Sequence, residues 1–581
     1  MASSLTAGAA LAALPRSPLG AARAAANQPA LATAGGGVRA RRPNILFVYV
    51  DQQRPDWLGC AGEFPEKIPV ITPHLDRLAA NGVRFTNAVC PAPVCAASRN
   101  CLASGAEYHN NGGNWGNSHC FPMSRLSFYA HLRDAGYHVL QAGKLDLTKG
   151  LDIPFVPTTV KPKHGKTSML ELGFSDMLEV IGKWAGEGAW GGRFTTDKFP
   201  IDPYEIHLQA KGLFEAYRDD FMTRDRLGDR AYTDPAPLED ADYKDNWITE
   251  RLIEMVARVP GGKPWFAQLN LDNPHGPNDI TKRMEGTVRG RDMPRPFKVD
   301  SQFTSEKHVA MRQNYTAQVE NNDRLVGRFL EYLRQSGQFE NTLVVFSADH
   351  GEMMGDHGLF GKGKWYWQSS HVPLIISGPG VLSGRVISAP ATNMDLAATF
   401  LEYAGVPTPA DMDSRSMKGL IEGKTSSHRD HVLSGLGMTS NGWRMAYDGR
   451  YKLIKYTRKG TLHLYDRQTD PYETSDVAAQ HPDVVTRLAA RFAEERPMTP
   501  EPFIVIKRDP EGDAHTFNVH AGAVGNVARP VQKVELYHNG VKIDEKPLNL
   551  AIANIKGLTA GRHVFKVVVD GEFTKEMEFK P

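Results

Sequence analysis

Two short polar pairs, each directly after an apolar run of strand length, carry side chains that can bind a metal ion. Asp51 and Gln52 follow NILFVYV, and Asp349 and His350 follow TLVVFSA. In a parallel sheet such strand ends converge, so two carboxylates, an amide oxygen and an imidazole can hold one divalent cation. Mostly oxygen ligation suits calcium or magnesium better than zinc, although the histidine weakens that choice. Taken alone, each pair is more simply a helix cap or a loop.

A second segment whose residues could do chemistry is PVCAASRNCLASG, residues 93–105. It is small and polar, and Cys95 stands four residues before Arg99 in it. The five cysteines of the chain all lie in its first quarter, without the CxxC pairs of a zinc site: Cys60, Cys90, Cys95, Cys101 and Cys120. An odd count leaves at least one thiol unpaired in an exported protein, and Cys95 is our candidate, with a disulfide expected among the others. The alternative is a buried free cysteine beside an arginine.

The elements that must position these residues read as an α/β fold. Apolar strands alternate with helical stretches such as PHLDRLAANG and ENNDRLVGRFLEYLRQSG, and the strands break into polar loops, as in PWFAQLNLDNPHGP. This alternation predicts a large mixed, mainly parallel sheet flanked by helices, with functional loops at the strand ends. Residues 155–245 fit the rhythm poorly, and we expect them to be an insertion near the substrate.

Beyond residue 430 the pattern changes to antiparallel strands followed by the helix PDVVTRLAARFAEE. Three prolines near residue 500 mark a boundary, and Asn539-Gly540 and Asp570-Gly571 then predict hairpin turns. We therefore expect an α/β domain over 43–430, a smaller antiparallel C-terminal subdomain over 431–500, and an accessory β-sandwich over 505–581.

The overall charge argues against some partners. With 581 residues, 41% hydrophobic residues and a formal charge of +2, the chain gives no electrostatic case for nucleic acid or an anionic membrane surface. Residues 1–42 are rich in alanine and glycine and end in VRARR, which predicts an export signal and linker; a disordered tail is the alternative. No other segment approaches the length of a membrane span. We expect a periplasmic or secreted protein.

The segment around Cys95 resembles the signature of the type I sulfatases, C/S-x-P-x-R with a downstream Leu and Gly. The matching positions are Cys95, Ala97, Ser98, Arg99, Leu102 and Gly105. The resemblance implies that Cys95 is oxidised after synthesis to formylglycine by a maturation enzyme, and that the aldehyde hydrate is the nucleophile. Ala97 replaces the usual proline, so the resemblance implies poor processing by an aerobic formylglycine-generating enzyme and is compatible with the alternative maturation route of the family.

Further matches follow in family order over about residues 43–495, and they imply an alkaline phosphatase-like sulfatase fold. Metal positions fall on Asp51, Gln52, Cys95, Asp349 and His350, although Gln52 replaces an aspartate. Catalytic and substrate-binding positions fall on Lys144, His275 and Lys362, and Asp146 stands where most members have histidine. His371, before VPLI, is either a further substrate contact or a structural histidine.

The chemistry of sulfate esters agrees with these implied roles. The ester is anionic, so a cation with Lys144 and Lys362 would offset charge on the transferring group. Arg99 suits fixing of the hydrate through its guanidinium fork. His275 would protonate a poor alkoxide leaving group as general acid. Release of sulfate then needs a base, and the resemblance implies that Asp146 would take the place of the usual histidine.

EYHNNGGNW, AGKLDLTKG and LNLDNPHGP are similar to the arylsulfatase K branch, which removes 2-O-sulfate from glucuronate in glycosaminoglycans. The similarity implies a sulfated saccharide substrate, with a sulfated uronate as the specific expectation. Two alternatives stay open: a phosphonate or phosphodiester hydrolase of the alkaline phosphatase superfamily, and a sulfated-glycan-binding protein without turnover.

Overall fold

The computed structural model describes most of the chain after residue 41. The described residues are 42–62, 64, 66–111, 121, 126–147, 172–183, 203–227, 230–299, 302–437, 442–457, 459–494, 501–508, 515–524, 533–546, 550–558 and 560–580. Residues 1–41 of the predicted leader lie outside the described residues, as does Cys120.

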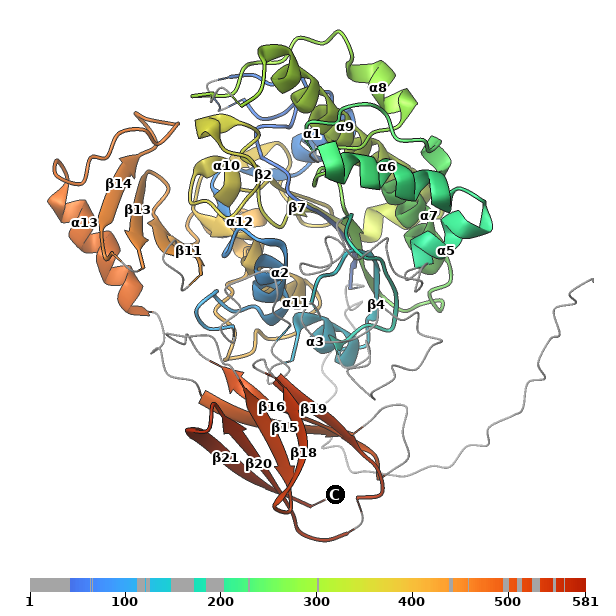
Figure 1. Ribbon diagram of the computed structural model, residues 1–581, viewed down its shortest axis with the longest axis vertical. Helices are drawn as coiled ribbons and strands as arrows, with labels where there is room; N and C mark the ends of the chain where they lie inside the picture. Colours follow the sequence, from blue (N-terminus) through green and yellow to red (C-terminus); the bar gives the residue numbers. More distant parts are fainter. Residues whose placement is uncertain are drawn as a thin grey trace, which may run out of the picture. The chain divides into compact units, whose positions relative to one another are not determined.

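An eight-stranded sheet runs through the α/β part of the molecule (Figure 1). Its strands in spatial order are β5 (Asp176–Glu179), β4 (His138–Gly143), β6 (Trp265–Leu271), β1 (Asn44–Val50), β7 (Thr342–Ala348), β8 (Leu374–Ser377), β2 (Val83–Phe85) and β9 (Arg385–Ile387). The first five are parallel, whereas β8 is antiparallel to both of its neighbours. The prediction of a mixed, mainly parallel sheet is confirmed.

The three central strands are buried at every position, which explains their continuous apolar sequences. Helices α1 (Pro73–Ala80), α7 (Lys244–Ala257) and α9 (Ser305–Gln335) form one packed group, and α2 (Cys95–Ser104), α3 (Phe128–Asp134) and α11 (Leu396–Tyr403) form another. Figure 1 shows the sheet running between the two groups. Further helices in the described residues before the antiparallel sheet are α5 (Pro203–Ala210), α6 (Phe214–Leu227), α8 (Lys282–Val288), α10 (Trp367–Ser370) and α12 (Lys418–Ile421).

The expectation that residues 155–245 form an insertion is wrong for part of that segment. Residues 176–179 are strand β5, which pairs with β4 at one edge of the main sheet. The start of α7, at Lys244, also falls inside the segment, and α7 packs on β4 and β6. Residues 155–171 and 184–202 lie outside the described residues.

An antiparallel sheet follows, as predicted. Its strands in order are β11 (Val432–Leu436), β12 (Trp443–Tyr447), β13 (Tyr451–Tyr456) and β14 (Leu462–Asp466). Helix α13 (Pro482–Ala489) packs on β12 and β13. A separate parallel pair joins β3 (Ala88–Val89) to β10 (Ala391–Thr392).

The C-terminal strands form two sheets around one apolar core, which confirms the added β-sandwich. One sheet contains β15 (Glu501–Arg508), β16 (Phe517–Val524) and β19 (Leu550–Ile555); the other contains β18 (Val541–Lys546), β17 (Val534–His538), β20 (His563–Val569) and β21 (Phe573–Phe579). Both residues of Asn539-Gly540 and of Asp570-Gly571 have positive φ, as the predicted hairpin turns require.

Within the described residues, no helix is both long and apolar enough to cross a bilayer. Four of the cysteines are free thiols, so the expected disulfide does not form among them: Cys60, Cys90, Cys95 and Cys101.

A buried ion pair fixes the start of α11. Asp395 is fully buried and accepts hydrogen bonds from the Arg429 guanidinium, at 2.8 Å from Nε, and from the Arg415 amide. Despite burial, Arg429 and His428 hold the pKa of Asp395 well below its ordinary value. Such a carboxylate contributes stability above its unfolded pKa, and this contribution is lost as the pH falls towards the folded pKa.

We therefore expect Asp395→Asn to lower the free energy of unfolding at pH 7 by about 3 kcal/mol, because it leaves the Arg429 charge buried without its partner. Urea denaturation at pH 7 and pH 3 measures the difference. It should shrink at the lower pH, and an equal loss at both values would contradict the ion-pair explanation.

Candidate active site

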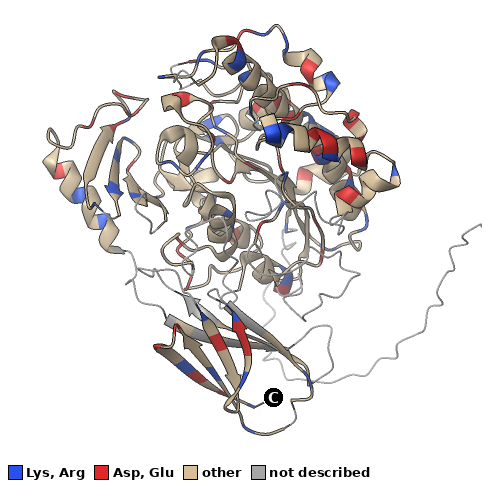
Figure 2. Ribbon diagram, viewed as in Figure 1, with Lys and Arg blue, Asp and Glu red and all other residues tan. Residues whose placement is uncertain are grey.

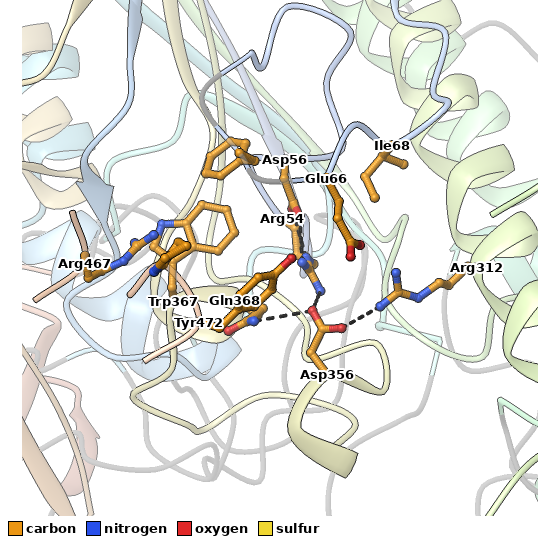
Figure 3. A pocket seen from close by; sticks show the side chains of 12 residues that line it. Arg54, Asp56, Glu66, Ile68, Arg312, Asp356, Trp367, Gln368, Arg467 and Tyr472 are labelled. Carbon is orange, nitrogen blue, oxygen red and sulfur yellow. Dashed lines mark hydrogen bonds and ion pairs between the residues drawn. The ribbon is translucent and has the colours of Figure 1, made fainter. Parts of the chain in front are cut away.

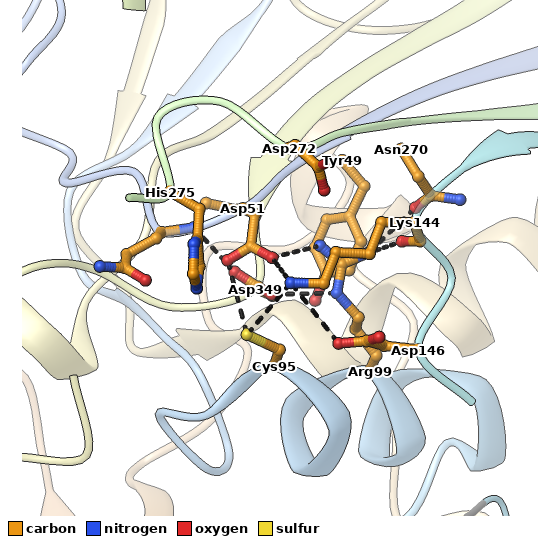
Figure 4. A network of polar contacts seen from close by, with 12 residues as sticks. Tyr49, Asp51, Cys95, Arg99, Lys144, Asp146, Asn270, Asp272, His275 and Asp349 are labelled. Carbon is orange, nitrogen blue, oxygen red and sulfur yellow. Dashed lines mark hydrogen bonds and ion pairs between the residues drawn. The ribbon is translucent and has the colours of Figure 1, made fainter. Parts of the chain in front are cut away.

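The carboxyl ends of four neighbouring strands deliver polar side chains to one place (Figure 4). In the sheet order β4-β6-β1-β7, the loops after these strands carry, respectively, Lys144, His275, Asp51 and Asp349. Parallel strands bring their carboxyl ends to the same edge of a sheet, so residues far apart in the sequence meet there. Cys95, the first residue of α2, joins them.

Four buried residues each place one donor atom within 4.8 Å of the other three, and we call them the four-donor cluster: Asp51, Cys95, Asp349 and His350. The Cys95 sulfur is 3.6 Å from Asp51 Oδ1 and 3.3 Å from His350 Nε2. His350 Nε2 is 3.7 Å from Asp51 Oδ1 and 3.6 Å from Asp349 Oδ1. Metal–donor distances of about 2.0–2.6 Å place adjacent donors about 3–3.7 Å apart, so this spacing suits one divalent cation.

Two lysines bring positive charge to the cluster. Lys362 Nζ is 2.7 Å from the Cys95 sulfur, and Lys144 Nζ is 3.5 Å from the same sulfur and contacts Asp51. Burial favours the neutral thiol, but the charges of Lys144 and Lys362 outweigh it and lower the pKa of Cys95 to about 5. The thiol is therefore ionised at neutral pH, and the same charges would attract an anionic ester.

Arg99 is buried one turn after Cys95 on α2 and orients the groups around it. Its Nε donates to Asp349 Oδ2 at 2.9 Å, and one terminal nitrogen donates to the backbone carbonyl of Lys144 at 2.7 Å. The guanidinium also lies over the Tyr49 ring, 4.9 Å from its centre. Arg99 thus joins the ends of β4 and β7 to α2.

Gln52 borders the cluster in an unusual backbone conformation. Its φ of 68° lies in the left-handed region, and its N–H donates to Asp349 Oδ1 at 2.9 Å. The side-chain Nε2 donates to Glu352, which leaves Oε1 to accept from Lys362 Nζ at 3.1 Å. The amide oxygen of Gln52 therefore lies beside the same lysine that contacts the Cys95 sulfur.

The loop that carries Lys362 is anchored by buried carboxylates. Glu352 accepts the backbone N–H groups of Met354 and Gly361. Farther along, Asp356 accepts from Arg54 and from Arg312, both at 2.7 Å (Figure 3). The pocket in Figure 3 is lined by these three residues together with others, and it contains none of the cluster residues.

Asp146 lies beside Lys144, with 3.6 Å between its Oδ2 and Lys144 Nζ. Like Gln52 it has a positive φ, of 58°, in a turn whose Leu145 N–H donates to Glu179 Oε1 at 3.1 Å. Burial and the charge of Asp146 raise the pKa of Glu179 to about 8. Glu179, at the end of β5, therefore holds a proton at neutral pH next to Asp146.

His275 is partly exposed and faces Asp51 in Figure 4. Its Nδ1 lies 2.5 Å from the Gly276 carbonyl, which can only accept, so Nδ1 carries a proton and Nε2 is left for other contacts. Loss of hydration around the ring, which is only partly exposed, and the charge of Lys362 hold the pKa of His275 well below its ordinary value.

His371 lies apart from these residues. It is fully buried, its backbone forms an antiparallel β-bridge with Val89, and its ring packs near Trp367 and Tyr447. Burial keeps its pKa well below the ordinary value. This environment fits the structural histidine of the two sequence interpretations, and the structure gives His371 no contact with the four-donor cluster.

Sequence reasoning missed several charged residues near the site, of which Glu179 is half-buried and the others are buried: Lys183, Lys244, Asp245, Asp272 and Glu352. Asp272 was recognisable, because it directly follows the predicted strand before His275 and stands where Asp51 stands after β1. Lys244 Nζ lies 2.6 Å from the carboxylate of Asp272. The others carry no signal in their local sequence.

The fold is shared with other proteins of known structure. Solved structures with the same fold include a phosphonate monoester hydrolase from Agrobacterium radiobacter, with a TM-score of 0.62, 21% identity, and coverage of 79% of this chain and 98% of that one. Another was solved with its substrate D-glucosamine-2-N,6-O-disulfate, with a TM-score of 0.58, 21% identity, and coverage of 78% and 97%. This chain therefore shares its fold with both of these proteins.

Sequence comparison gives the family. The Sulfatase family model matches residues 43–406, and a model for the C-terminal part of N-sulphoglucosamine sulphohydrolase matches residues 355–497. An arylsulfatase of Clostridium perfringens is 26% identical over 459 residues, covering 75% of this chain and 90% of the relative. Arylsulfatase K of Danio rerio is 26% identical over 470 residues, covering 76% and 82%. The chain belongs to the sulfatase family and is a sulfuric ester hydrolase.

Sulfatases generally use a metal ion and formylglycine, and the residues present fit both groups. Two carboxylate oxygens and one imidazole nitrogen converge on the cysteine sulfur, at distances suited to a single cation. An oxygen in place of that sulfur would make the donor set mostly oxygen, as calcium and magnesium prefer.

Proposed function

We propose that this sulfatase hydrolyses sulfate esters of a sulfated polysaccharide, through a formylglycine hydrate made from Cys95. The observation that supports this most directly is the position of the Cys95 sulfur. It lies among the donors of the candidate cation site and within 3.5 Å of the ammonium groups of Lys144 and Lys362. An oxygen nucleophile at this position would meet the sulfur atom of an ester whose charge the lysines offset.

Asp51, Asp349 and His350 would hold the divalent cation, calcium or magnesium, with Gln52 as a further ligand. The cation would supply Lewis-acid stabilisation of negative charge on the transferring group. Arg99 keeps Asp349 turned towards this site through the hydrogen bond from its Nε. We further propose that Arg99 helps to fix the hydrate.

His275 would protonate the leaving alkoxide, and Asp146 would accept a proton from the remaining hydroxyl when sulfate is expelled. The low pKa of His275 in the free protein means that substrate must assist the first role. A bound sulfate ester brings negative charge between Lys144 and Lys362, which raises the proton affinity of the imidazole.

For the substrate we propose a glycosaminoglycan-type saccharide carrying a uronate 2-O-sulfate. The similarity to arylsulfatase K supports this choice, and an N-acetylglucosamine-6-O-sulfatase of Bacteroides thetaiotaomicron, 26% identical over 488 residues, supports a sulfated sugar more generally. A second candidate is phosphonate or phosphodiester hydrolysis, favoured by two fold neighbours that are phosphonate monoester hydrolases, with TM-scores of 0.62 and 0.63. Binding of sulfated glycans without turnover is a third, weaker alternative.

We also propose export to the periplasm or the medium, with a formylglycine-installing enzyme as a maturation partner. The composition of residues 1–42 supports export. So does a relative described as an extracellular sulfatase, from Drosophila melanogaster.

The test uses full-length protein matured at Cys95 and a panel of defined sulfated saccharides, with phosphodiesters and phosphonate monoesters alongside. We expect sulfate release from a 2-O-sulfated uronate, with a kcat/KM above that for every phosphorus ester. A strong preference for phosphodiesters would support the second candidate instead. Glycan binding without any release would support the third.

A further inference from the structure

The loop that carries His275, residues 272–279, is held by buried side chains from outside it, and we call it the His275 loop. Asp245, the second residue of α7, is fully buried. One of its carboxylate oxygens accepts the N–H of Asp272 at 2.9 Å, and the other accepts the N–H of Asn273 at 2.8 Å. A single carboxylate therefore fixes the first two peptide groups of the loop.

Lys183 ties the two ends of the loop together. Its Nζ lies 2.7 Å from Asn273 Oδ1 near the start and 2.7 Å from Asp279 Oδ1 at the end. It also donates to the Pro277 carbonyl at 3.3 Å. The lysine is 2% exposed, so all three contacts are made away from solvent.

One face of α9 completes the enclosure. Asn314, Gln318 and Asn322 are spaced four residues apart, which places them on one side of the helix. Their side-chain amides donate to the backbone carbonyls of Asn278 at 2.7 Å, Asp279 at 2.9 Å and Asn273 at 3.0 Å, respectively.

The buried charges that hold the His275 loop carry an electrostatic cost that a purely structural anchor could avoid by apolar packing. Burial and the neighbouring charge of Asp272 raise the pKa of Asp245 to about 7, so its ionised form is disfavoured where it stands. Apolar packing often stabilises a core as well as buried ionic groups do. The carboxylate and the lysine instead specify the positions of individual peptide groups.

The peptide groups of the loop determine the orientation of the catalytic imidazole. The Gly276 carbonyl, inside the loop, accepts from Nδ1 of His275 and so sets which edge of the ring carries the free Nε2. A shift of the loop backbone would move this carbonyl and turn the imidazole relative to Asp51, which it faces in Figure 4. Small displacements of a proton donor are costly, because proton transfer requires hydrogen-bond distance to the substrate atom.

We propose that Asp245 and Lys183 are positioning residues for His275, acting through the backbone of the His275 loop to aim Nε2 at the oxygen that leaves with the sugar. The proposal rests on the acid role of His275 in the proposed function. It makes a specific demand: loss of either residue slows substrates that need a proton on the leaving oxygen, and spares those that do not.

The test compares two esters with full-length matured protein: a sulfated saccharide, whose alkoxide needs the proton, and 4-nitrophenyl sulfate, whose phenolate leaves without one. For Asp245→Asn we expect kcat on the sugar sulfate to fall by about 10–100-fold, the usual range for a residue that orients a functional group. The rate with 4-nitrophenyl sulfate should change much less. Lys183→Met should give the same selective pattern.

Asp323 offers a matched control. It is a buried carboxylate that also accepts two adjacent backbone N–H groups, those of His74 at 3.0 Å and Leu75 at 2.7 Å, at the start of α1. Burial raises its pKa to about 7, as for Asp245. Asp323→Asn should therefore cost similar stability, yet change the two rates equally. A merely structural role for Asp245 predicts the same unselective result.

His275→Ala separates failure of the inference from failure of the proposed function. If His275→Ala slows both esters equally, the acid role itself is wrong. If His275→Ala is selective for the sugar sulfate while Asp245→Asn behaves like Asp323→Asn, the positioning role is overturned. In the double variant that combines His275→Ala with Asp245→Asn, the second substitution should not lower kcat on the sugar sulfate any further. If Asp245→Asn does not fold, Asn322→Ala removes one hydrogen bond from the same loop and gives the same comparison.

Discussion

Replacing Cys95 with alanine is expected to reduce sulfate release by at least about 10³-fold, because it removes the atom from which the nucleophile is made. The substitution deletes one buried sulfur at the first position of α2 and keeps the helix intact. Lys144 keeps its ion pair with Asp51, and Lys362 keeps its hydrogen bond to Gln52, so we expect a change in stability of only about 1–2 kcal/mol. Sulfate release with the sulfated saccharide panel, together with thermal unfolding, measures both effects.

Cys101 provides the control for this experiment. It is a fully buried thiol on the same helix, but it lies outside the four-donor cluster, and Asn111 donates to its sulfur. Cys101→Ser should retain turnover, and intact mass should distinguish the thiol from the aldehyde at Cys95 in each preparation. Retained sulfate release by Cys95→Ala would refute Cys95 as the precursor of the nucleophile.

The convergence of the site could be predicted because strand ends obey a simple rule. Asp51 and Asp349 each follow a continuous apolar run, and adjacent parallel strands must deliver such residues to one edge. The structure places their carboxylates around His350 as that rule requires. The position of Cys95 had no such basis, since α2 has little amphipathic pattern and only the family resemblance indicated that its first residue enters the site.

The supporting residues could not be predicted, because their partners are remote in sequence. Lys183 stands in a segment without a clear pattern, and its contacts lie near Asn273 and Asp279. Strand β5 was missed for a related reason: its four residues, DMLE, are too short and too polar to stand out from a loop. Both errors fall where tertiary contacts, and not local preference, decide the structure.

The same hydrogen-bonding arrangement recurs in the loops that surround Cys95. In three of them a buried carboxylate accepts two backbone N–H groups: Asp349 holds Gln52 and His350, Glu352 holds Met354 and Gly361, and Asp245 holds Asp272 and Asn273. Each carboxylate fixes two peptide groups through their N–H groups. The proposed cation ligands Gln52 and His350, the loop of Lys362 and the loop of the proposed acid His275 are thus held by the same kind of interaction.

In our proposal Asp349 combines this backbone role with cation binding, so its charge can be tested separately from its shape. Asp349→Asn keeps an oxygen to accept the N–H groups of Gln52 and His350, but it removes the negative charge that faces Arg99 and the cation. We expect calcium binding to be lost, together with at least about 10²-fold in turnover, because the neutral amide is a poor ligand and charge stabilisation falls with it.

Calorimetric titration with calcium and a sulfate-release assay measure the two losses on the same preparation. Asp395→Asn is the matched control: it also leaves a buried arginine without its carboxylate, but Asp395 belongs to no part of the cluster. It should lose stability and still bind calcium. If Asp349→Asn bound calcium as tightly as the parent and kept its turnover, the cation would have to lie elsewhere. The donor spacing around Cys95 would then need another explanation.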